Sequence, residues 1–117
     1  MDASEPTTFE EFWAYYVSQH RDPTCRRLHF VGTTLAMGCL AATPVFPPAL
    51  LAAPVCGYGL AWIGHFAFEK NRPASWHSAK HAWWSFKGDL RMWMYMARGD
   101  MEAEVERVED ELGLAAA

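Results

Sequence analysis

The residues of this chain whose types could do chemistry together are its histidines and one neighbouring glutamate. The five histidines are His20, His29, His65, His77 and His81, and the glutamate is Glu69. Imidazole and carboxylate groups without a thiolate are ligands that Fe(II), Zn(II) and Mn(II) all accept. A single histidine is more often structural than a ligand, so the placement of these residues along the chain has to decide between the two roles.

The spacing of three histidines predicts that they converge. His29 and His65 are equally distant in sequence from Pro47, which lies in the proline-rich turn "PVFPP". In an antiparallel helical hairpin, equal distance from the turn places two residues at the same level. Glu69 follows His65 by four residues and shares its helical face. His20 ends the preceding helix shortly before His29. We therefore expect these residues to meet at one end of the hairpin, where either two histidines with the carboxylate or all three histidines could hold a metal ion and leave open positions.

His77 and His81 form a second pair with helical spacing, and such a pair can hold a metal ion on one helix face. The surrounding segment is rich in lysine and serine. A solvated polar face is therefore the alternative, and it is the interpretation that we favour over ligation by both residues.

Other chemistries find little support in the sequence. There is no G-x-S-x-G element, no G-x-G-x-x-G loop and no P-loop. The formal net charge is −4, and no basic patch typical of nucleic-acid binding is present. The three cysteines, Cys25, Cys39 and Cys56, show no C-x-x-C spacing, which indicates free thiols rather than a disulfide framework.

The elements that must position these residues are all helical. Capping signals and hydrophobic periodicity predict a small all-α protein with one domain over residues 1–117. An apolar helical hairpin is expected over about 24–43 and 49–69. Amphipathic helices are expected over about 8–20, 75–97 and 100–112, and residues 100–117 form an acidic amphipathic C-terminal helix with a short tail.

The hairpin is apolar enough to suggest a membrane. No Asp, Glu, Lys or Arg occurs from Leu28 to Phe68. Arms of roughly 16 and 20 residues would span roughly 24 and 30 Å, which suits a thin or tilted membrane hairpin. The alternative is a buried hairpin in a soluble bundle. Basic residues flank both ends of the hairpin and are absent from its turn, so an integral membrane hairpin would keep both termini in the cytoplasm.

Two motifs carry a resemblance to a known family. The first is Y-x₃-H-x₈-H-x₂-G, matched by Tyr16, His20, His29 and Gly32. The second is G-H-x₃-E-x-N-x-P, matched by Gly64, His65, Glu69, Asn71 and Pro73. Together they resemble the Mpo-type 2-hydroxy fatty acid dioxygenases, small membrane proteins once catalogued only as a domain of unknown function. The similarity extends from about Phe9 to Gly99.

The resemblance implies an Fe(II)-dependent dioxygenase of fatty acid α-oxidation. Such an enzyme converts a 2-hydroxy fatty acid and O₂ into the fatty acid one carbon shorter and CO₂. The family's histidines carry over onto His20, His29 and His65, and Glu69 matches a family position as ligand or orienting residue. The basic residues Arg26, Lys70 and Arg72 could hold the substrate head group by charge.

Other functions remain open at this stage. The main alternative is a non-enzymatic membrane module that binds lipid or assists assembly, in which the histidines are structural. Haem binding by facing histidines is a further possibility. The glycines of the apolar arms permit close helix approach, so a homodimer in the membrane is possible.

Overall fold

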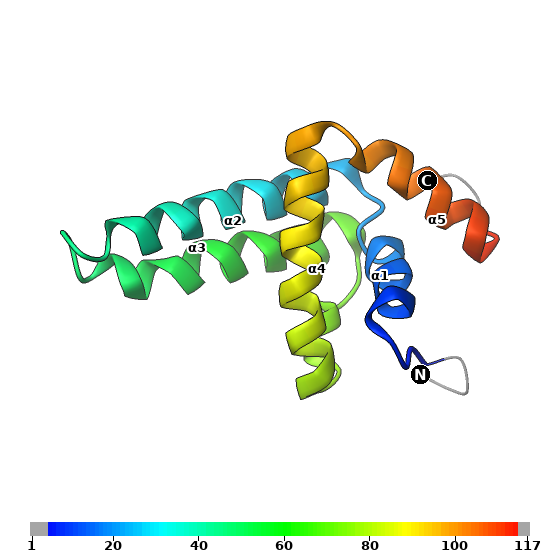
Figure 1. The fold of residues 1–117 in the computed structure, drawn as a ribbon, viewed down its shortest axis with the longest axis horizontal. Helices are drawn as coiled ribbons and strands as arrows, with labels where there is room; N and C mark the ends of the chain where they lie inside the picture. The colour runs from blue at the N-terminus through cyan, green and yellow to red at the C-terminus, as the bar shows by residue number, and fades with distance from the viewer. Residues whose placement is uncertain (1–4, 115–117) are drawn as a thin grey trace. The chain divides into compact units, whose positions relative to one another are not determined.

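The computed structural model describes residues 5–114, and within that range the fold is all-helical, as expected, with no strand (Figure 1). Five α-helices are α1 (Phe9–Ser18), α2 (Pro23–Ala42), α3 (Ala49–Ile63), α4 (Ala79–Arg98) and α5 (Met101–Leu112). A π-helix, η1 (Gly64–Glu69), continues α3, and a short 3₁₀ helix, η2 (Ala74–Trp76), precedes α4.

Local capping explains where the first two helices begin. The Thr8 hydroxyl accepts a hydrogen bond from the Glu11 amide at 3.2 Å, as an N-cap residue does. The Asp22 carboxylate accepts from the Cys25 amide at 3.0 Å, and Pro23 occupies the first turn, where its missing N–H costs nothing. These starts agree with the expected helices over 8–20 and 24–43.

The expected helix over 75–97 differs from the structure at its beginning. Ser78 has an extended backbone and its hydroxyl accepts from the His81 amide at 3.1 Å, so α4 begins only at Ala79. The preceding residues Ala74–Trp76 form a separate 3₁₀ turn. The Ser78 hydroxyl takes the His81 amide as its hydrogen-bond donor, and a side chain that bonds to the nearby backbone in this way favours a helix cap over a helix interior.

The contacts within the chain divide it into two compact units. Unit 1 comprises Met1–Arg21 and Ala74–Ala117, of which residues 5–21 and 74–114 are described. Unit 2 comprises Asp22–Pro73. The single domain over 1–117 therefore stays a prediction, and the last residues of its expected C-terminal tail, 115–117, lie outside the described residues.

Unit 1 packs α1 against α4 and α5 around an aromatic core. Phe12 and Val17 of α1 are completely buried, as is Val108 of α5, and Met92 of α4 is almost completely buried. Gly88 allows α4 to approach the Tyr16 ring closely, because a Cβ at this position would lie 3.2 Å from the ring. The aromatic face of the first helix is thus the core of this unit.

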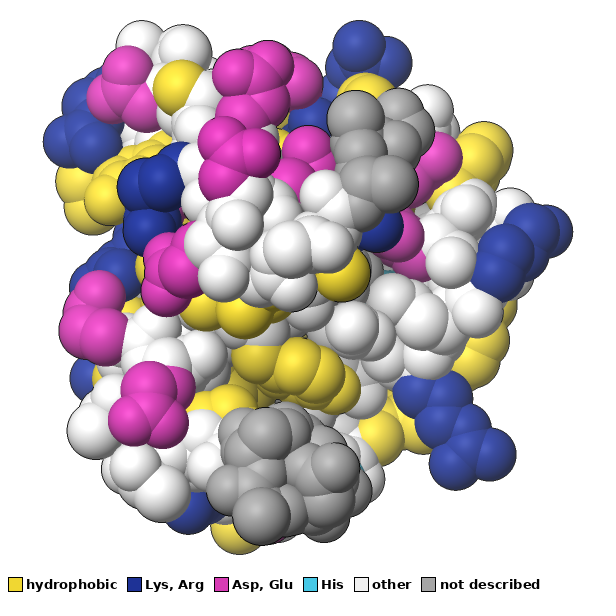
Figure 2. Space-filling view, turned by 90° about the vertical axis from the view of Figure 1, so that its right-hand side faces the viewer, with side chains coloured by type: hydrophobic (Ala, Val, Ile, Leu, Met, Phe, Trp, Pro, Cys, Tyr) yellow, Lys and Arg dark blue, Asp and Glu magenta, His cyan; other side chains and the backbone are white. Residues whose placement is uncertain are grey.

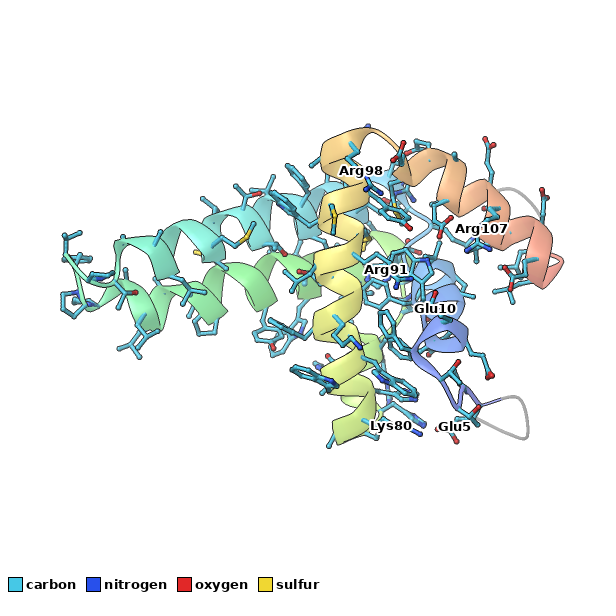
Figure 3. All side chains as sticks on the ribbon, in the orientation of Figure 1. Glu5, Glu10, Lys80, Arg91, Arg98 and Arg107 are labelled. Atoms are coloured by element: carbon cyan, nitrogen blue, oxygen red, sulfur yellow. The ribbon has the colours of Figure 1, made fainter. Side chains whose placement is uncertain are left out.

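Ion pairs and hydrogen bonds join the same helices at their edges. Arg91 donates two hydrogen bonds to the Glu10 carboxylate at 3.0 and 2.8 Å, and the two side chains point toward one another in Figure 3. The Trp13 indole N–H donates to Glu104 at 2.6 Å. Arg21 donates to Glu109 at 2.9 Å. Both acidic and basic side chains are exposed on the side shown in Figure 2.

Unit 2 is the expected helical hairpin. α2 and α3 run antiparallel side by side and are joined by the proline-rich turn (Figure 1). Two glycines permit the close approach of the arms. A Cβ on Gly32 would lie 2.9 Å from the Cys56 carbonyl oxygen, and a Cβ on Gly64 would lie 2.9 Å from the Cys25 sulfur. Contact at this range is possible only where one helix lacks a side chain.

The outer surface of the hairpin is apolar. Among its most exposed side chains are Leu51 at 75 %, Val55 at 71 % and Phe46 at 60 %. Among the described residues, one helical segment, Ala49–Glu69, is long and apolar enough to cross a membrane, and only 22 % of its most apolar window is buried. The first arm does not meet the same criterion, so the expectation of two membrane-spanning arms is not supported.

The close approach at Gly32 yields a prediction about stability. Gly32→Ala should lower the free energy of unfolding by about 1–3 kcal/mol, since the added methyl overlaps the facing helix. Gly38→Ala is the matched control, because Gly38 lies in the same helix with no atom within 4 Å of an added Cβ. The control should be neutral or slightly stabilising, because alanine favours helix. Equal midpoints for both variants in thermal unfolding would contradict the proposed close contact.

Candidate metal centre

Two histidines from the two arms meet inside unit 2. The Nε2 atom of His29, in α2, lies 3.2 Å from the Nε2 atom of His65, in η1. The two rings are perpendicular, at 89°, with centroids 5.0 Å apart. Both residues are buried, at 6 % and 2 % exposure. The structure therefore brings together the pair whose equal distance from the turn predicted their proximity.

His65 is held in place by the chain that follows it. Its ring Nδ1–H donates to the Asn71 side-chain oxygen at 2.7 Å. Its backbone carbonyl accepts the amides of Lys70 and Asn71, the latter at 3.0 Å. Lys70 adopts a left-handed conformation with φ 62°, which ends the π-helix and turns the chain back over the histidine. π-Helical turns of this kind occur frequently at functional sites.

The partner of Nδ1 determines which ring nitrogen of His65 carries the lone pair. An amide oxygen only accepts hydrogen bonds, so Nδ1 is protonated and a neutral ring has its lone pair on Nε2. His20 of unit 1 shows the same arrangement, since its Nδ1–H donates to the Tyr16 carbonyl at 2.6 Å and its ring stacks on Tyr16 with centroids 4.0 Å apart. Metal-binding histidines are held in this way, with the other nitrogen bonded to an oxygen acceptor.

The separation of the two Nε2 atoms fits two ligands of one metal ion. A metal–nitrogen distance of about 2.0–2.1 Å and an angle of about 100° at the metal place two nitrogens about 3.2 Å apart. In the absence of a metal, the His29 Nε2–H can instead donate to the lone pair of His65. The donor set of buried imidazoles therefore suits a borderline transition-metal ion.

Glu69 has a defined backbone partner in unit 2. Its carboxylate accepts a hydrogen bond from the Asp22 amide, which precedes the first turn of α2. This contact ties the end of the second arm to the beginning of the first. The side chain that orients His65 is Asn71, so the ligand and orienting roles expected for Glu69 stay predictions.

His20 belongs to unit 1, whereas His29 and His65 belong to unit 2. Within its own unit, His20 is completely buried and lies just beyond the end of α1. The set of three histidine ligands consequently stays a prediction, and it is supported by the Nδ1 hydrogen bonds that give His20 and His65 the same tautomer, each within its own unit.

The basic residues expected at the substrate head group differ in burial. Arg26 is buried at 2 % exposure, one helical turn before His29 in α2. Lys70 and Arg72 are exposed and follow the π-helix. Of the three, Arg26 is the buried cation close to His29, whereas Lys70 and Arg72 lie on the surface.

The second histidine pair lies in unit 1 and is not a uniformly solvated face. His77 is 43 % exposed, but the side chain of His81 is completely buried. The carboxylate of Glu5 lies 3.2 Å from His77 Nε2 and 3.7 Å from His81 Nε2. The favoured interpretation of a polar, solvent-facing pair is therefore wrong for His81.

Sequence reasoning assigned no role to Asn71 or to Glu5. Asn71 was visible as a fixed position of the second motif, six residues after His65, but the spacing alone does not reveal a hydrogen bond across a π-helical turn. For Glu5 no signal existed, because it lies far in sequence from His77 and His81.

The protein is therefore an all-helical protein with a buried pair of imidazoles that could hold a metal ion. Comparison with protein families then places the chain. The family model described as "2-hydroxy-palmitic acid dioxygenase Mpo1-like" matches residues 6–101, and the chain belongs to this Mpo1-like family. Neither a curated protein nor a solved structure matches the chain.

The hydrogen bond from His65 to Asn71 yields a prediction about metal affinity. Asn71→Ala should weaken metal binding about 10–100-fold, because the oxygen that accepts from Nδ1–H orients a metal-binding histidine. Asn71→Asp keeps an oxygen acceptor and should retain most of the affinity. Equilibrium dialysis with Fe(II) under anaerobic conditions measures both variants. An Asn71→Ala variant that binds Fe(II) as tightly as the unmodified chain would contradict the positioning role.

Proposed function

We propose that this protein is an Fe(II)-dependent dioxygenase that shortens 2-hydroxy fatty acids by one carbon. A 2-hydroxy acid and O₂ balance to the acid one carbon shorter, CO₂ and water. The substrate supplies all four electrons, so the reaction requires no separate reductant. Membership of the Mpo1-like family supports the substrate class and the reaction.

The observation that carries the proposal is the approach of His29 and His65 to 3.2 Å between their Nε2 atoms. In the proposal, these atoms and the Nε2 atom of His20 hold the iron. When bound there, Fe(II) supplies open positions for the substrate and the capacity to activate O₂. The protein's part is to keep two of these rings in the correct tautomer, that of His65 through Asn71 and that of His20 through the Tyr16 carbonyl.

The head group of the substrate needs a positive partner near the histidines. A 2-hydroxy carboxylate can present its hydroxyl and one carboxylate oxygen to a metal, which leaves the other oxygen for a cation. We assign this contact to Arg26, because it is buried one turn from His29 and a guanidinium pairs well with a carboxylate. Lys70 and Arg72, at the exposed rim, would attract the acid before it enters.

The acyl chain requires an apolar environment, and the outer surface of unit 2 offers one. Side chains drawn along α2 and α3 in Figure 3 are mostly carbon. Exposure of this surface in a small chain is more typical of contact with lipid than of a soluble protein. We therefore propose that the hairpin lies in a membrane and that the substrate enters from the lipid, with both termini on the cytoplasmic side.

Iron content and oxygen consumption test the activity. The full chain, purified anaerobically, should contain about one Fe(II) per chain and take up O₂ when 2-hydroxypalmitate is added. Palmitate, which lacks the 2-hydroxyl group, is the matched control and should cause no uptake. His29→Ala and His65→Ala should each reduce turnover by at least about 100-fold, because each removes a proposed ligand.

Two results would overturn this assignment. One is full iron content and turnover in both histidine variants. The other is a stable, lipid-bound protein without metal or oxygen uptake, which would favour the alternative of a non-enzymatic lipid-binding module with structural histidines.

Membrane insertion is tested separately. The unmodified chain should remain in the membrane fraction after alkaline carbonate extraction. Val55→Lys combined with Tyr58→Lys should release it, because both exposed side chains lie toward the middle of Ala49–Glu69 and each charge near the membrane centre costs about 2.5–3.5 kcal/mol on insertion scales. Leu112→Lys, at an exposed leucine of α5, is the control and should not change the distribution. Extraction of the unmodified chain by carbonate would contradict the membrane proposal.

A further inference from the structure

We propose that Glu5, His77 and His81 bind a divalent transition-metal ion at a second site, within unit 1 and independent of His29 and His65. The proposal does not depend on the dioxygenase activity. It rests on the geometry of the three side chains, on the burial of one of them and on their ligand chemistry.

The three side chains present their ligand atoms to one point. Glu5 Oε1 lies 3.2 Å from His77 Nε2 and 3.7 Å from His81 Nε2. One ligand atom from each of the three residues lies within 4.8 Å of the others. Ligands of a single Zn²⁺ at about 2.0–2.2 Å lie about 3.0–3.5 Å apart, so the two distances from Glu5 Oε1 are within a few tenths of an ångström of that spacing.

His81 is the observation that points to a ligand. Its side chain has no exposed surface, yet neither ring nitrogen has a hydrogen-bond partner among residues 5–114. Buried polar groups normally have partners, and an unsatisfied one needs an explanation. The Phe12 ring, with its centroid 5.1 Å away, and the Trp84 ring, at 6.1 Å, pack against the imidazole and supply no acceptor. Among residues 5–114, Glu5 and His77 are the metal-ligating side chains that group with it.

The electrostatics of His81 also suit a metal ligand. Burial lowers the pKa of His81, and the neighbouring His77 lowers it further. Glu5 opposes part of this shift, but the net direction favours the neutral imidazole, which is the form that coordinates metal. Lys80, the nearest cation in sequence, places its ammonium group over the Trp84 ring, 5.0 Å from the centroid.

Two imidazoles and one carboxylate form a common ligand set for Zn²⁺ and related divalent ions, with a fourth position left for water. Glu5 and His77 are 40 % and 43 % exposed, so an ion can enter from solvent and reach the buried His81. Figure 3 shows Glu5, from the segment before α1, beside Lys80 at the start of α4. A bound ion would therefore join these two segments of unit 1.

Zinc stoichiometry tests the site on the full chain. The unmodified protein is dialysed against Zn²⁺ and compared with Glu5→Gln, His77→Gln and the control Glu106→Gln, which changes an exposed glutamate elsewhere in unit 1. The first two variants should bind one Zn²⁺ fewer per chain than the unmodified protein and the control. Neither replaced residue is buried, so the variants should fold. Zn²⁺ should raise the thermal midpoint of the unmodified chain and of Glu106→Gln by several degrees, and that of His77→Gln by much less.

A double variant, His29→Ala with His65→Ala, separates the two sites. It should keep one equivalent of Co²⁺ with visible d–d absorption, and adding His77→Gln should abolish that absorption. Equal Zn²⁺ stoichiometry in the unmodified chain, Glu5→Gln and His77→Gln would overturn the second site. Loss of iron and oxygen uptake would leave it unaffected, because neither measurement involves Glu5 or His77.

Discussion

The close approach of the two hairpin arms is the constraint on which the rest of the site depends. Gly32 and Gly64 remove the side chains that would keep the backbones apart, and the arms meet where His29 and His65 lie. Within this close packing the imidazoles of the two helices bring their Nε2 atoms to 3.2 Å. The close packing of the two arms and the placement of the two nitrogen donors therefore occur at the same end of the hairpin.

Orientation is added to proximity by hydrogen bonds around the rings. The Asn71 side-chain oxygen accepts a hydrogen bond from Nδ1–H of His65 and so selects the tautomer with its lone pair on Nε2, and the Tyr16 carbonyl does the same for His20. The π-helical turn matters because it lets Lys70 and Asn71 fold back onto the histidine that precedes them. This local departure from a regular α-helix thus lets the residues that follow His65 hold its ring and its carbonyl, and no other helix is needed for these contacts.

The two units have surfaces of different character. Unit 2 exposes aliphatic and aromatic side chains along its arms, whereas unit 1 buries its aromatic residues and joins its helices through ion pairs such as Arg91 with Glu10. The first surface suits lipid and the second suits water. Each unit also contains buried histidine, which in unit 1 is accompanied by a carboxylate and in unit 2 by a carboxamide.

The sequence by itself determined the helices and the meeting of His29 with His65. Helix caps at Thr8 and Asp22 are local, and depth in an antiparallel hairpin follows directly from distance to the turn, so both could be inferred without coordinates. Only the tertiary structure decided that Glu69 binds the Asp22 amide, that Asn71 orients His65, and that His81 is buried beside Glu5. These contacts depend on the path of the connecting segments and on which helix face is packed, and neither is encoded in residue spacing.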